Sequence, residues 1–359
     1  MSLTQIVITG GPCAGKTTCM SVLEQRLTER GYKVIVASET ATEMILSGIC
    51  PLDMGRALFE RYLVEWQLAK EKVMQEVAAF FPKVILLLDR GIPDCLAYIS
   101  EKEYLEILAL HNLKKNEAWQ RYDAVFHLVT AAEGAEEFYT CQNNVARQEK
   151  DLEEARLADR KTQAVYVGHP HLRIIDNSTD FEGKVNRLCH EVFSVLGLPV
   201  PLEIERKFLI ERPSEQDLLA HGAVSQKIVQ AYLKPNGNTE RRIRERGDEN
   251  GFACFYTEKK TISPTKRIEK EEKISQTKYM SLLTEAEHIL TKTRWCFLEK
   301  GQYFELDIFD SVPDKALLEI ELTNENQQIS LPDWCREIKE VTDLDEYRNY
   351  SIAQKGFPK

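Results

Sequence analysis

Short apolar runs and longer helical patterns alternate along the first 198 residues. The runs that read as buried strands are residues 5–9, 33–37, 84–88, 124–129 and 172–175. Helical patterns lie between them at residues 16–30, 55–80 and about 144–163, and a helix over about 181–196 ends at Gly197. In the 55–80 segment, helical spacing joins Leu58, Tyr62, Trp66, Ala69 and Val73. This alternation predicts an α/β domain with a parallel sheet covered by helices on both faces.

The pattern changes after residue 198 to short strands in which apolar and charged residues alternate. The predicted strands are residues 203–210, 226–233, 240–246, 252–259, 266–274, 292–298, 302–309 and 316–323, with a helical piece at about 277–290. Prolines at 199–201 would stop the preceding helix. We therefore expect two domains, residues 1–198 and 199–359, the second an α+β domain built on an eight-stranded antiparallel barrel.

Composition narrows the classes of function. The chain of 359 residues has a formal net charge of −10, which argues against non-specific nucleic-acid binding. Its nine cysteines show no metal-binding spacing and read as free thiols of a reducing compartment. No apolar run is long enough for a transmembrane helix, and the N-terminus lacks a signal-peptide pattern. The expectation is a cytoplasmic protein.

The first apolar run leads directly into a phosphate-loop motif. Residues 10–17 match G-x4-G-K-[ST], between a strand and a helix. The predicted phosphate-binding residues are Gly10, Gly11, Pro12, Cys13, Ala14, Gly15, Lys16, Thr17 and Thr18. Lys16 would reach the β- and γ-phosphates of ATP or GTP, and Thr17 would place its hydroxyl on Mg²⁺. For Cys13, the plain alternative is a small side chain tolerated in the loop.

Carboxylates follow two of the apolar runs. Asp89 ends the run 84–88 and precedes Arg90, and Glu39 follows the run 33–37. Because the carboxyl ends of parallel strands form the ligand-binding edge, Asp89 could hold Mg²⁺ or orient an acceptor, and Glu39 could act as a general base. A turn or cap role for Asp89, and a solvated Glu39, are the structural alternatives.

The charged segment at 144–163 carries Arg147, Arg156 and Arg160, which either close over a phosphate as a lid or pair with glutamates on a solvated helix. Together with GGPCAGKTT at the loop and DRGIPDCLAY at 89–98, this segment resembles the P-loop kinase-like ATPase family that includes nucleoside-kinase relatives. The resemblance implies that Asp89, Arg90 and Arg147 take part in catalysis. It does not identify the phosphoryl acceptor.

Charged residues recur on one face of the strands in the second half. They include Glu203, Glu205 and Lys207 at its start, and the pairs Arg242/Arg244, Lys292/Arg294, Glu305/Asp307 and Glu319/Glu321 further on. A solvated face of an antiparallel sheet would explain the charged residues of any single strand. The recurrence favours a barrel with this face inward, where carboxylates would bind Mg²⁺ or Mn²⁺ and cations would bind a triphosphate.

The ExExK pattern at 203–207 resembles the start of the CYTH, or triphosphate tunnel, family, over about residues 202–355. The resemblance implies a metal site at Glu203, Glu205, Glu319 and Glu321, with Glu305 and Asp307 as further candidates. It implies phosphate binding by Lys207, Arg242, Arg244, Lys259, Lys292 and Arg294, with Lys207 also catalytic. Class IV adenylate cyclases of the family carry His-Phe before ExExK, whereas residues 198–202 read Leu-Pro-Val-Pro-Leu, which argues against cyclase activity.

The order of the two predicted domains also resembles the TRPL translocation defect protein family, associated with GTP and phosphoinositide binding. Three hypotheses follow. The preferred one is a bifunctional enzyme, with a P-loop kinase or NTPase domain and a metal-dependent hydrolase of inorganic or nucleoside triphosphate. The second is a non-enzymatic module, controlled by ATP or GTP, that binds a phosphorylated ligand such as a phosphoinositide. The third is an adenylate cyclase.

Overall fold

The computed structural model describes residues 2–139, 151–198, 205–237, 239–263, 266–322, 327–336 and 338–358. The chain forms two compact units, Met1–His190 and Glu191–Lys359, and each is described by itself. Residues 199–204 are outside the described ranges, so a domain boundary between residues 198 and 199 stays a prediction.

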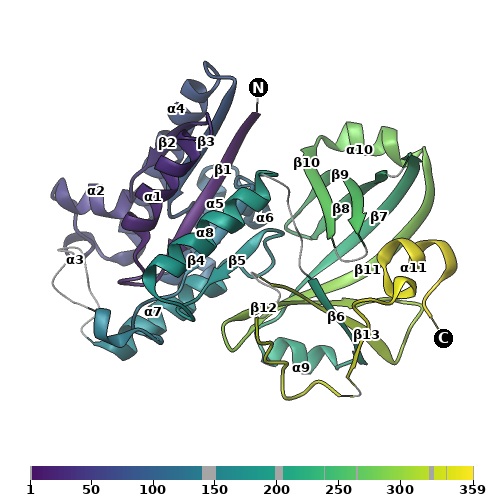
Figure 1. The fold of residues 1–359 in the computed structure, drawn as a ribbon. Helices are drawn as coiled ribbons and strands as arrows, with labels where there is room; N and C mark the ends of the chain where they lie inside the picture. The colour runs from purple at the N-terminus through teal and green to yellow at the C-terminus, as the bar shows by residue number, and fades with distance from the viewer. Residues whose placement is uncertain are drawn as a thin grey trace. The chain divides into compact units, whose positions relative to one another are not determined.

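The first unit is built on a five-stranded parallel sheet in the order β2-β3-β1-β4-β5 (Figure 1). The strands are β1 (Ser2–Gly10), β2 (Lys33–Ala37), β3 (Lys83–Asp89), β4 (Ala124–Leu128) and β5 (Leu172–Ile175). All five predicted strands and the parallel α/β sheet are confirmed. Residues 6–10 of β1, 84–88 of β3 and 124–128 of β4 are buried, as expected for a sheet covered on both faces.

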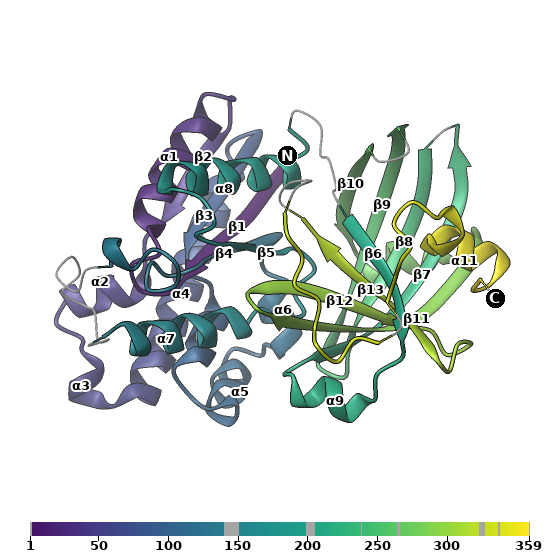
Figure 2. The ribbon, with the colours of Figure 1, turned by 60° about the horizontal axis from the view of Figure 1, so that its bottom comes forward.

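Helices cover both faces of this sheet. They are α1 (Lys16–Thr28), α2 (Thr40–Leu46), α3 (Pro51–Met54), α4 (Arg56–Ala78), η1 (Ile92–Ala97), α5 (Glu101–Leu110), α6 (Lys115–Trp119), η2 (Glu136–Phe138), α7 (Leu152–Ala164) and α8 (Phe181–Val195). Figure 2 shows α1 and α8 on one side of the sheet and α4 and α7 on the other. The Arg26 guanidinium of α1 donates to the Asn186 side chain of α8 at 2.8 Å, which joins the first pair.

The long helix α4 confirms the predicted element but buries an unexpected face. Its buried positions include Glu60, Gln67 and Glu71 beside Phe59 and Val64. The residues Leu58, Tyr62, Trp66 and Val73, which helical spacing had joined, are exposed. The buried polar groups have partners: Arg121 and Tyr122 donate to the Glu71 carboxylate, and Thr40 donates to Gln67. Hydrogen bonding therefore compensates the desolvation of this face.

The second unit holds a nine-stranded antiparallel sheet in the order β10-β9-β8-β7-β11-β12-β13-β6-β14. The strands are β6 (Glu205–Glu211), β7 (Val224–Asn236), β8 (Thr239–Asp248), β9 (Gly251–Ser263), β10 (Lys266–Ile274), β11 (Ala286–Glu299), β12 (Gln302–Ile308), β13 (Lys315–Glu321) and β14 (Lys339–Glu340). The other elements are α9 (Glu215–Ala220), α10 (Gln276–Leu283), η3 (Asp345–Tyr347) and α11 (Asn349–Lys355). Among the described residues β10 and β14 stay at the two edges, so a large antiparallel sheet is present and closure into a barrel is not shown.

One predicted element of this unit is partly wrong. The helical piece expected at 277–290 ends at Leu283, and residues 286–290 already belong to β11. The pairing of Ile289 with Ala231 of β7 explains the difference, because cross-strand hydrogen bonds hold this segment extended.

Alternation along the strands divides the sheet into an apolar and a charged face, as predicted. Phe208, Ile210, Leu306, Leu318 and Ile320 share one hydrophobic core. The alternate residues of the same strands carry the charges considered below. Among the helices of the described residues, none has the length and apolar character needed to span a bilayer.

Candidate functional site

The phosphate loop joins the end of β1 to the start of α1, as the motif requires. Gly15 precedes the helix with φ of 83°, and Cys13 has φ of 55°, so the loop contains left-handed residues. A Cβ on Gly10 would lie 2.2 Å from the Leu128 carbonyl oxygen, and one on Gly11 would lie 2.3 Å from Asp159 Oδ1. Close packing against β4 and α7 therefore demands glycine at both positions.

A cleft of about 1010 Å³ opens beside this loop. Of the predicted residues, Pro12, Cys13, Ala14, Gly15, Lys16, Thr17, Thr18, Glu39, Asp89 and Arg90 line it. Gly10 and Gly11 lie behind the lining, where they shape the loop. Arg147 is outside the described residues. The structure therefore brings the loop and the two predicted strand-end carboxylates into one cavity.

Glu39, Asp89 and Arg90 form the charged end of the cleft. Arg90 Nε donates to Glu39 Oε1 at 2.7 Å, and Arg90 Nη1 donates to Asp94 Oδ1 at 3.1 Å. Burial opposes ionisation of Glu39, but the charges of Arg90 and Lys16 prevail and lower its pKa to about 2. Burial raises the pKa of Asp89, with Glu39 and Asp94 adding to the effect and Lys16 opposing it. Two acidic groups in one cleft thus have pKa values moved in opposite directions.

The residues present fit a magnesium ion beside the loop. Asp89 Oδ1 is buried and has no hydrogen-bond partner among the described residues, a costly arrangement unless a ligand or cation meets it. Thr17 is exposed in the first turn of α1 and also lines the cleft. A hydroxyl and a carboxylate oxygen are ligands suited to Mg²⁺.

Asp94 is a buried residue that positions this end of the cleft and that was not among the predicted site residues. Its carboxylate accepts hydrogen bonds from the Thr9 hydroxyl, from the Gly91 backbone at 3.0 Å and from the Tyr166 hydroxyl at 2.7 Å, besides Arg90. Thr9 lies on β1 and Tyr166 follows α7, so Asp94 ties η1 to the sheet. In the sequence, the only sign of this role was that Asp94 lies four residues after Arg90.

Asp159 of α7 is a second residue that the sequence did not reveal. Its Oδ1 accepts hydrogen bonds from the backbone nitrogens of Gly11 at 2.7 Å and Thr130 at 3.1 Å, and lies 3.1 Å from His127 Nε2. Asp159 is 5% exposed and His127 is fully buried. The charged segment, for which the sequence left both a lid and a surface helix open, therefore anchors the phosphate loop through Asp159.

The described arginines of that segment do not line the cleft. Arg156 donates to the Ala132 carbonyl oxygen at 2.7 Å and pairs with Glu133, Glu136 and Glu153. Arg160 is exposed. For these two residues the arrangement matches the alternative of a charged surface helix, while the lid role of Arg147 stays a prediction.

The part of the cleft away from the loop mixes aromatic and buried polar side chains. Phe59, Glu60 and Gln67 of α4 line it, together with Arg56 and Tyr98. Glu60 is 1% exposed, and burial raises its pKa to about 7 although Arg56 Nε lies 2.8 Å away. This region has the character of a binding site for a small polar molecule.

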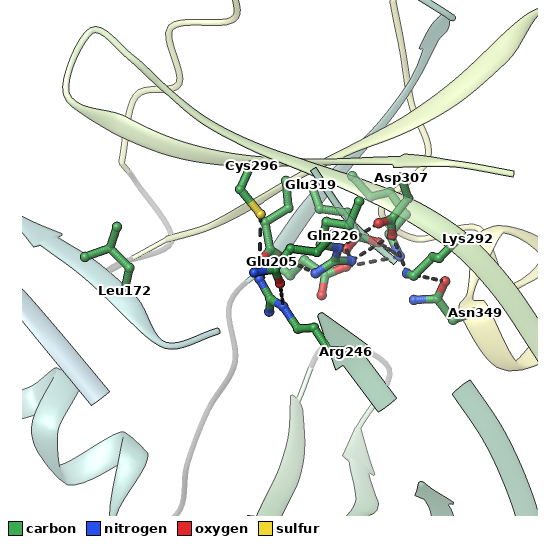
Figure 3. Close-up of polar contacts among 12 residues, drawn as sticks. Leu172, Glu205, Gln226, Arg246, Lys292, Cys296, Asp307, Glu319 and Asn349 are labelled. Atoms are coloured by element: carbon green, nitrogen blue, oxygen red, sulfur yellow. Dashed lines mark hydrogen bonds and ion pairs between the residues drawn. The ribbon is translucent and has the colours of Figure 1, made fainter. Parts of the chain in front are cut away.

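The second unit gathers buried ions on the charged face of its sheet (Figure 3). Arg294 Nε donates to Asp307 Oδ1 at 2.6 Å, and Arg294 Nη2 donates to Glu319 Oε2 at 2.7 Å. Lys207 Nζ lies 2.7 Å from Glu319 Oε1 and 3.2 Å from Glu205 Oε1. Lys292 pairs with Asp307 and donates to Asn349 Oδ1 at 3.0 Å.

These contacts shift the pKa values of Lys207 and Glu319 in the directions expected for ion pairs. Burial works against the charge of Lys207, but Glu205 and Glu319 prevail and raise its pKa. Burial likewise opposes ionisation of Glu319, and Lys207 and Arg294 hold its pKa well below the usual range. For Lys292 burial dominates over Asp307 and lowers the pKa to about 8.

Three arginines of β8 extend the cationic side of this face. Arg242 and Arg246 are buried, and Arg244 Nη2 donates to both oxygens of Glu271 at 3.0 Å. Burial lowers the pKa of Arg244, and the neighbouring Arg242, Arg246 and Arg294 lower it further against Glu271. Arg244 Nε is buried without a hydrogen-bond partner among the described residues. Arg246 was missed by the sequence reasoning, although it continues the alternation of Arg242 and Arg244.

The described residues do not assemble the predicted metal site of the second unit. No group of three His, Cys, Asp or Glu side chains within the described ranges is placed to hold a metal. Glu205, Glu305, Asp307 and Glu319 face lysine or arginine instead, and Glu321 is exposed. Glu203 is outside the described residues, so a metal site that includes it stays a prediction. Lys259, the last predicted cation, is half-buried on β9.

A family model described as an AAA domain matches residues 5–184. Among solved structures, the hypothetical protein NE1496 is 30% identical, with 44% of this chain and 99% of that chain covered and a TM-score of 0.32. A deoxyadenosine kinase from M. mycoides with bound dATP is 16% identical (53% and 98% covered, TM-score 0.37). HpAC1 from Hippeastrum, for which a dominant triphosphatase activity is described, is 17% identical (34% and 80% covered, TM-score 0.27). A comparison with curated proteins finds no match.

Proposed function

This chain belongs to the AAA domain family through residues 5–184, and from that premise we propose that it is a bifunctional nucleotide-binding protein. In the proposal the first unit binds ATP or GTP and transfers or hydrolyses its γ-phosphate. The second unit binds a triphosphate and hydrolyses it. The observation that carries the proposal is the cleft in which the phosphate loop meets Glu39, Asp89 and Arg90.

In the first unit, nucleotide phosphates would lie in the loop, against its backbone N–H groups and the N-terminus of α1. Lys16 would neutralise the β- and γ-phosphates. Thr17 and the unpartnered Asp89 Oδ1 would hold Mg²⁺, which when bound supplies charge neutralisation to the transferring phosphoryl group. This assignment gives a partner to a buried carboxylate oxygen of the cleft that lacks a hydrogen bond among the described residues.

The acceptor would lie in the polar and aromatic part of the cleft, lined by Phe59, Glu60, Gln67 and Tyr98. Glu39 lines the same cleft, and Arg90 Nε donates to its Oε1 at 2.7 Å. With a pKa lowered to about 2, Glu39 is ionised at neutral pH but weakly basic. Its charge therefore favours orienting an acceptor hydroxyl for in-line attack over acting as a strong base.

For the second unit, the support is the group of buried cations on its charged face. Besides burial, the charges of Arg242, Arg246 and Arg294 lower the pKa of Arg244. Arg244 also retains an Nε without a hydrogen-bond partner among the described residues. Guanidinium groups in this density suit the oxygens of a polyphosphate. We propose Lys207, Arg242, Arg244, Lys259, Lys292 and Arg294 as its phosphate ligands, in a sheet that closes into a tunnel.

Hydrolysis in the second unit requires the metal site predicted from Glu203, Glu205, Glu319 and Glu321. A bound metal would have to compete with Lys207, which contacts both Glu205 and Glu319. The competing proposal is that this face binds a phosphorylated ligand, such as a phosphoinositide headgroup, without turnover, under the control of nucleotide in the first unit. The observation in its favour is that Glu319 and Asp307 are engaged by Lys207, Lys292 and Arg294. An adenylate cyclase has no supporting observation.

Phosphate release from inorganic triphosphate, ATP and GTP, with Mg²⁺ and then Mn²⁺, separates these functions. The wild type is compared with Lys16→Ala and with Glu203→Ala/Glu205→Ala. Loss of triphosphate hydrolysis only in the glutamate variant supports hydrolysis in the second unit. Loss of NTP hydrolysis only in Lys16→Ala supports chemistry in the first. No release by folded wild type, with retained headgroup binding, would replace the bifunctional proposal with the binding module.

A further inference from the structure

The outer face of α4 carries a continuous apolar stripe. Its members are Leu58, Tyr62, Trp66, Ala69, Val73 and Val77 of the helix, and Phe80 just after it. All seven are exposed, Val73 to 58% and Phe80 to 83%. We call this set the α4 stripe. It repeats every three or four residues, which is the spacing of a helix face that packs on another element.

The first unit does not use the α4 stripe for its own core. The opposite face of the helix is buried through Phe59, Val64, Gln67 and Glu71, and Val64 belongs to a core cluster with η1 and α5. From Leu58 to Phe80 the stripe is about 33 Å long, and with a width of about 10 Å it covers roughly 300 Å². Single exposed apolar residues are ordinary, whereas a contiguous patch of this size is comparable to the largest apolar patch of a typical monomer, which is often functional.

We propose that the α4 stripe binds the α4 stripe of a second copy of this chain, with the two helices antiparallel about a two-fold axis near Ala69. Such an axis pairs residues whose numbers sum to about 138. It sets Leu58 against Phe80, Tyr62 against Val77 and Trp66 against Val73 of the other copy. Ala69 then meets Ala69, and its small side chain lets the helix axes approach closely.

Charge complementarity supports this orientation and this partner. Arg61, Glu65, Lys72 and Glu76 are exposed along one flank of the stripe. In an antiparallel pair related by a two-fold axis, the same flanks of the two helices face each other in reverse order. Arg61 then faces Glu76 of the other copy, and Glu65 faces Lys72. Each of the four flank residues then faces a residue of opposite charge, which favours the antiparallel pairing over a parallel one.

The four flank residues are available for these pairs. None of them forms an ion pair with another described residue, and Arg61 instead lies against the Tyr62 ring at 5.8 Å. The stripe with its flanks is smaller than a standard interface, so we expect a reversible dimer with a dissociation constant on the order of micromolar. The inference is independent of the proposed function, because none of the stripe residues lines the cleft.

Sedimentation equilibrium of the full-length chain over a range of concentrations tests the proposal. The wild type is expected to form dimers. Trp66→Glu/Val73→Glu is expected to be monomeric, whereas Leu219→Glu, a matched change of an exposed leucine in α9, is expected to dimerise as the wild type does. Thermal unfolding of each variant checks that it is folded.

A charge-reversal series tests the antiparallel arrangement itself. Arg61→Glu and Glu76→Arg each place like charges opposite one another and are expected to weaken dimerisation about tenfold. The double variant Arg61→Glu/Glu76→Arg restores opposite charges and is expected to recover wild-type association. A monomeric wild type, with the stripe covered by residues 191–359 or by nothing, overturns the proposal. So does a double variant that associates no better than either single variant.

Discussion

Asp159 Oδ1 accepts a 2.7 Å hydrogen bond from the backbone nitrogen of Gly11, across 148 residues of sequence. The same carboxylate holds Thr130, so one side chain of α7 ties together the phosphate loop and the loop after β4. The conformation of the phosphate loop therefore depends on the docking of α7, and not on the glycines alone.

Replacing Asp159 with alanine tests this dependence. The change leaves the Gly11 and Thr130 nitrogens without a charged acceptor, and such bonds contribute about 1.5–3 kcal/mol each. We expect Asp159→Ala to weaken binding of ATP or GTP at least about tenfold in isothermal titration calorimetry. Arg160→Ala, its exposed neighbour on α7, is the control and should bind nucleotide normally. Unchanged nucleotide affinity in folded Asp159→Ala would show that the glycines suffice.

The buried Glu60 predicts a pH dependence of stability. Burial raises its pKa to about 7, with Asp94 adding to the shift and Arg56 and Arg90 opposing it. In the unfolded chain its pKa is about 4.3, so the folded state binds the proton more tightly between these values. Stability therefore falls as pH rises from about 4.3 to about 7, by at most roughly 3 kcal/mol.

Glu60→Gln removes this titration. We expect the variant to gain stability relative to the wild type as the pH rises from 5 to 8, measured as the free energy of unfolding in urea. Glu24→Gln, a change of an exposed glutamate on α1, serves as the control and should follow the wild type at both pH values. Parallel stability profiles for Glu60→Gln and the wild type would mean that Glu60 titrates normally.

Neighbouring arginines of β8 allow a test of the charged face. Arg244 belongs to the group of buried cations and donates to Glu271. Arg241, three residues earlier, donates instead to the Tyr256 hydroxyl at 2.8 Å. We expect Arg244→Ala to weaken binding of inorganic triphosphate by about 10- to 100-fold, the loss of one charge-assisted contact. Arg241→Ala should change it less than about twofold. Equal effects of the two substitutions would indicate non-specific attraction to a basic surface.

Elements whose signal lies within a short stretch of sequence were predicted correctly. All five strands of the parallel sheet, the phosphate loop and the alternation in the second unit were predicted, because a buried strand or a motif of eight residues is visible in its own window. Glu39, Asp89 and Arg90 were found because strand ends in a parallel sheet converge on one edge. The short strand β14, which pairs only through Lys339 and Glu340, left no such pattern.

Features set by distant partners were not predictable in this way. The inner face of α4 is polar in sequence, and hydrogen bonds from Thr40, Arg121 and Tyr122 help to make its burial possible. Asp159 reads as one charge among many on a surface helix until Gly11 is placed beside it. Residues 286–290 have helical spacing but extend along β7 in the sheet. In each case tertiary hydrogen bonds override the local preference.

The central claim is that the phosphate loop of the first unit binds a nucleoside triphosphate, and calorimetric titration of the full-length chain with ATP and with GTP, in the presence of Mg²⁺, tests it most directly. We predict one site per chain for at least one of the two nucleotides. Lys16→Ala should abolish this site, and Asp89→Asn should weaken it only when Mg²⁺ is present. Binding that persists unchanged in Lys16→Ala, or no binding of either nucleotide to folded wild type, would contradict the account.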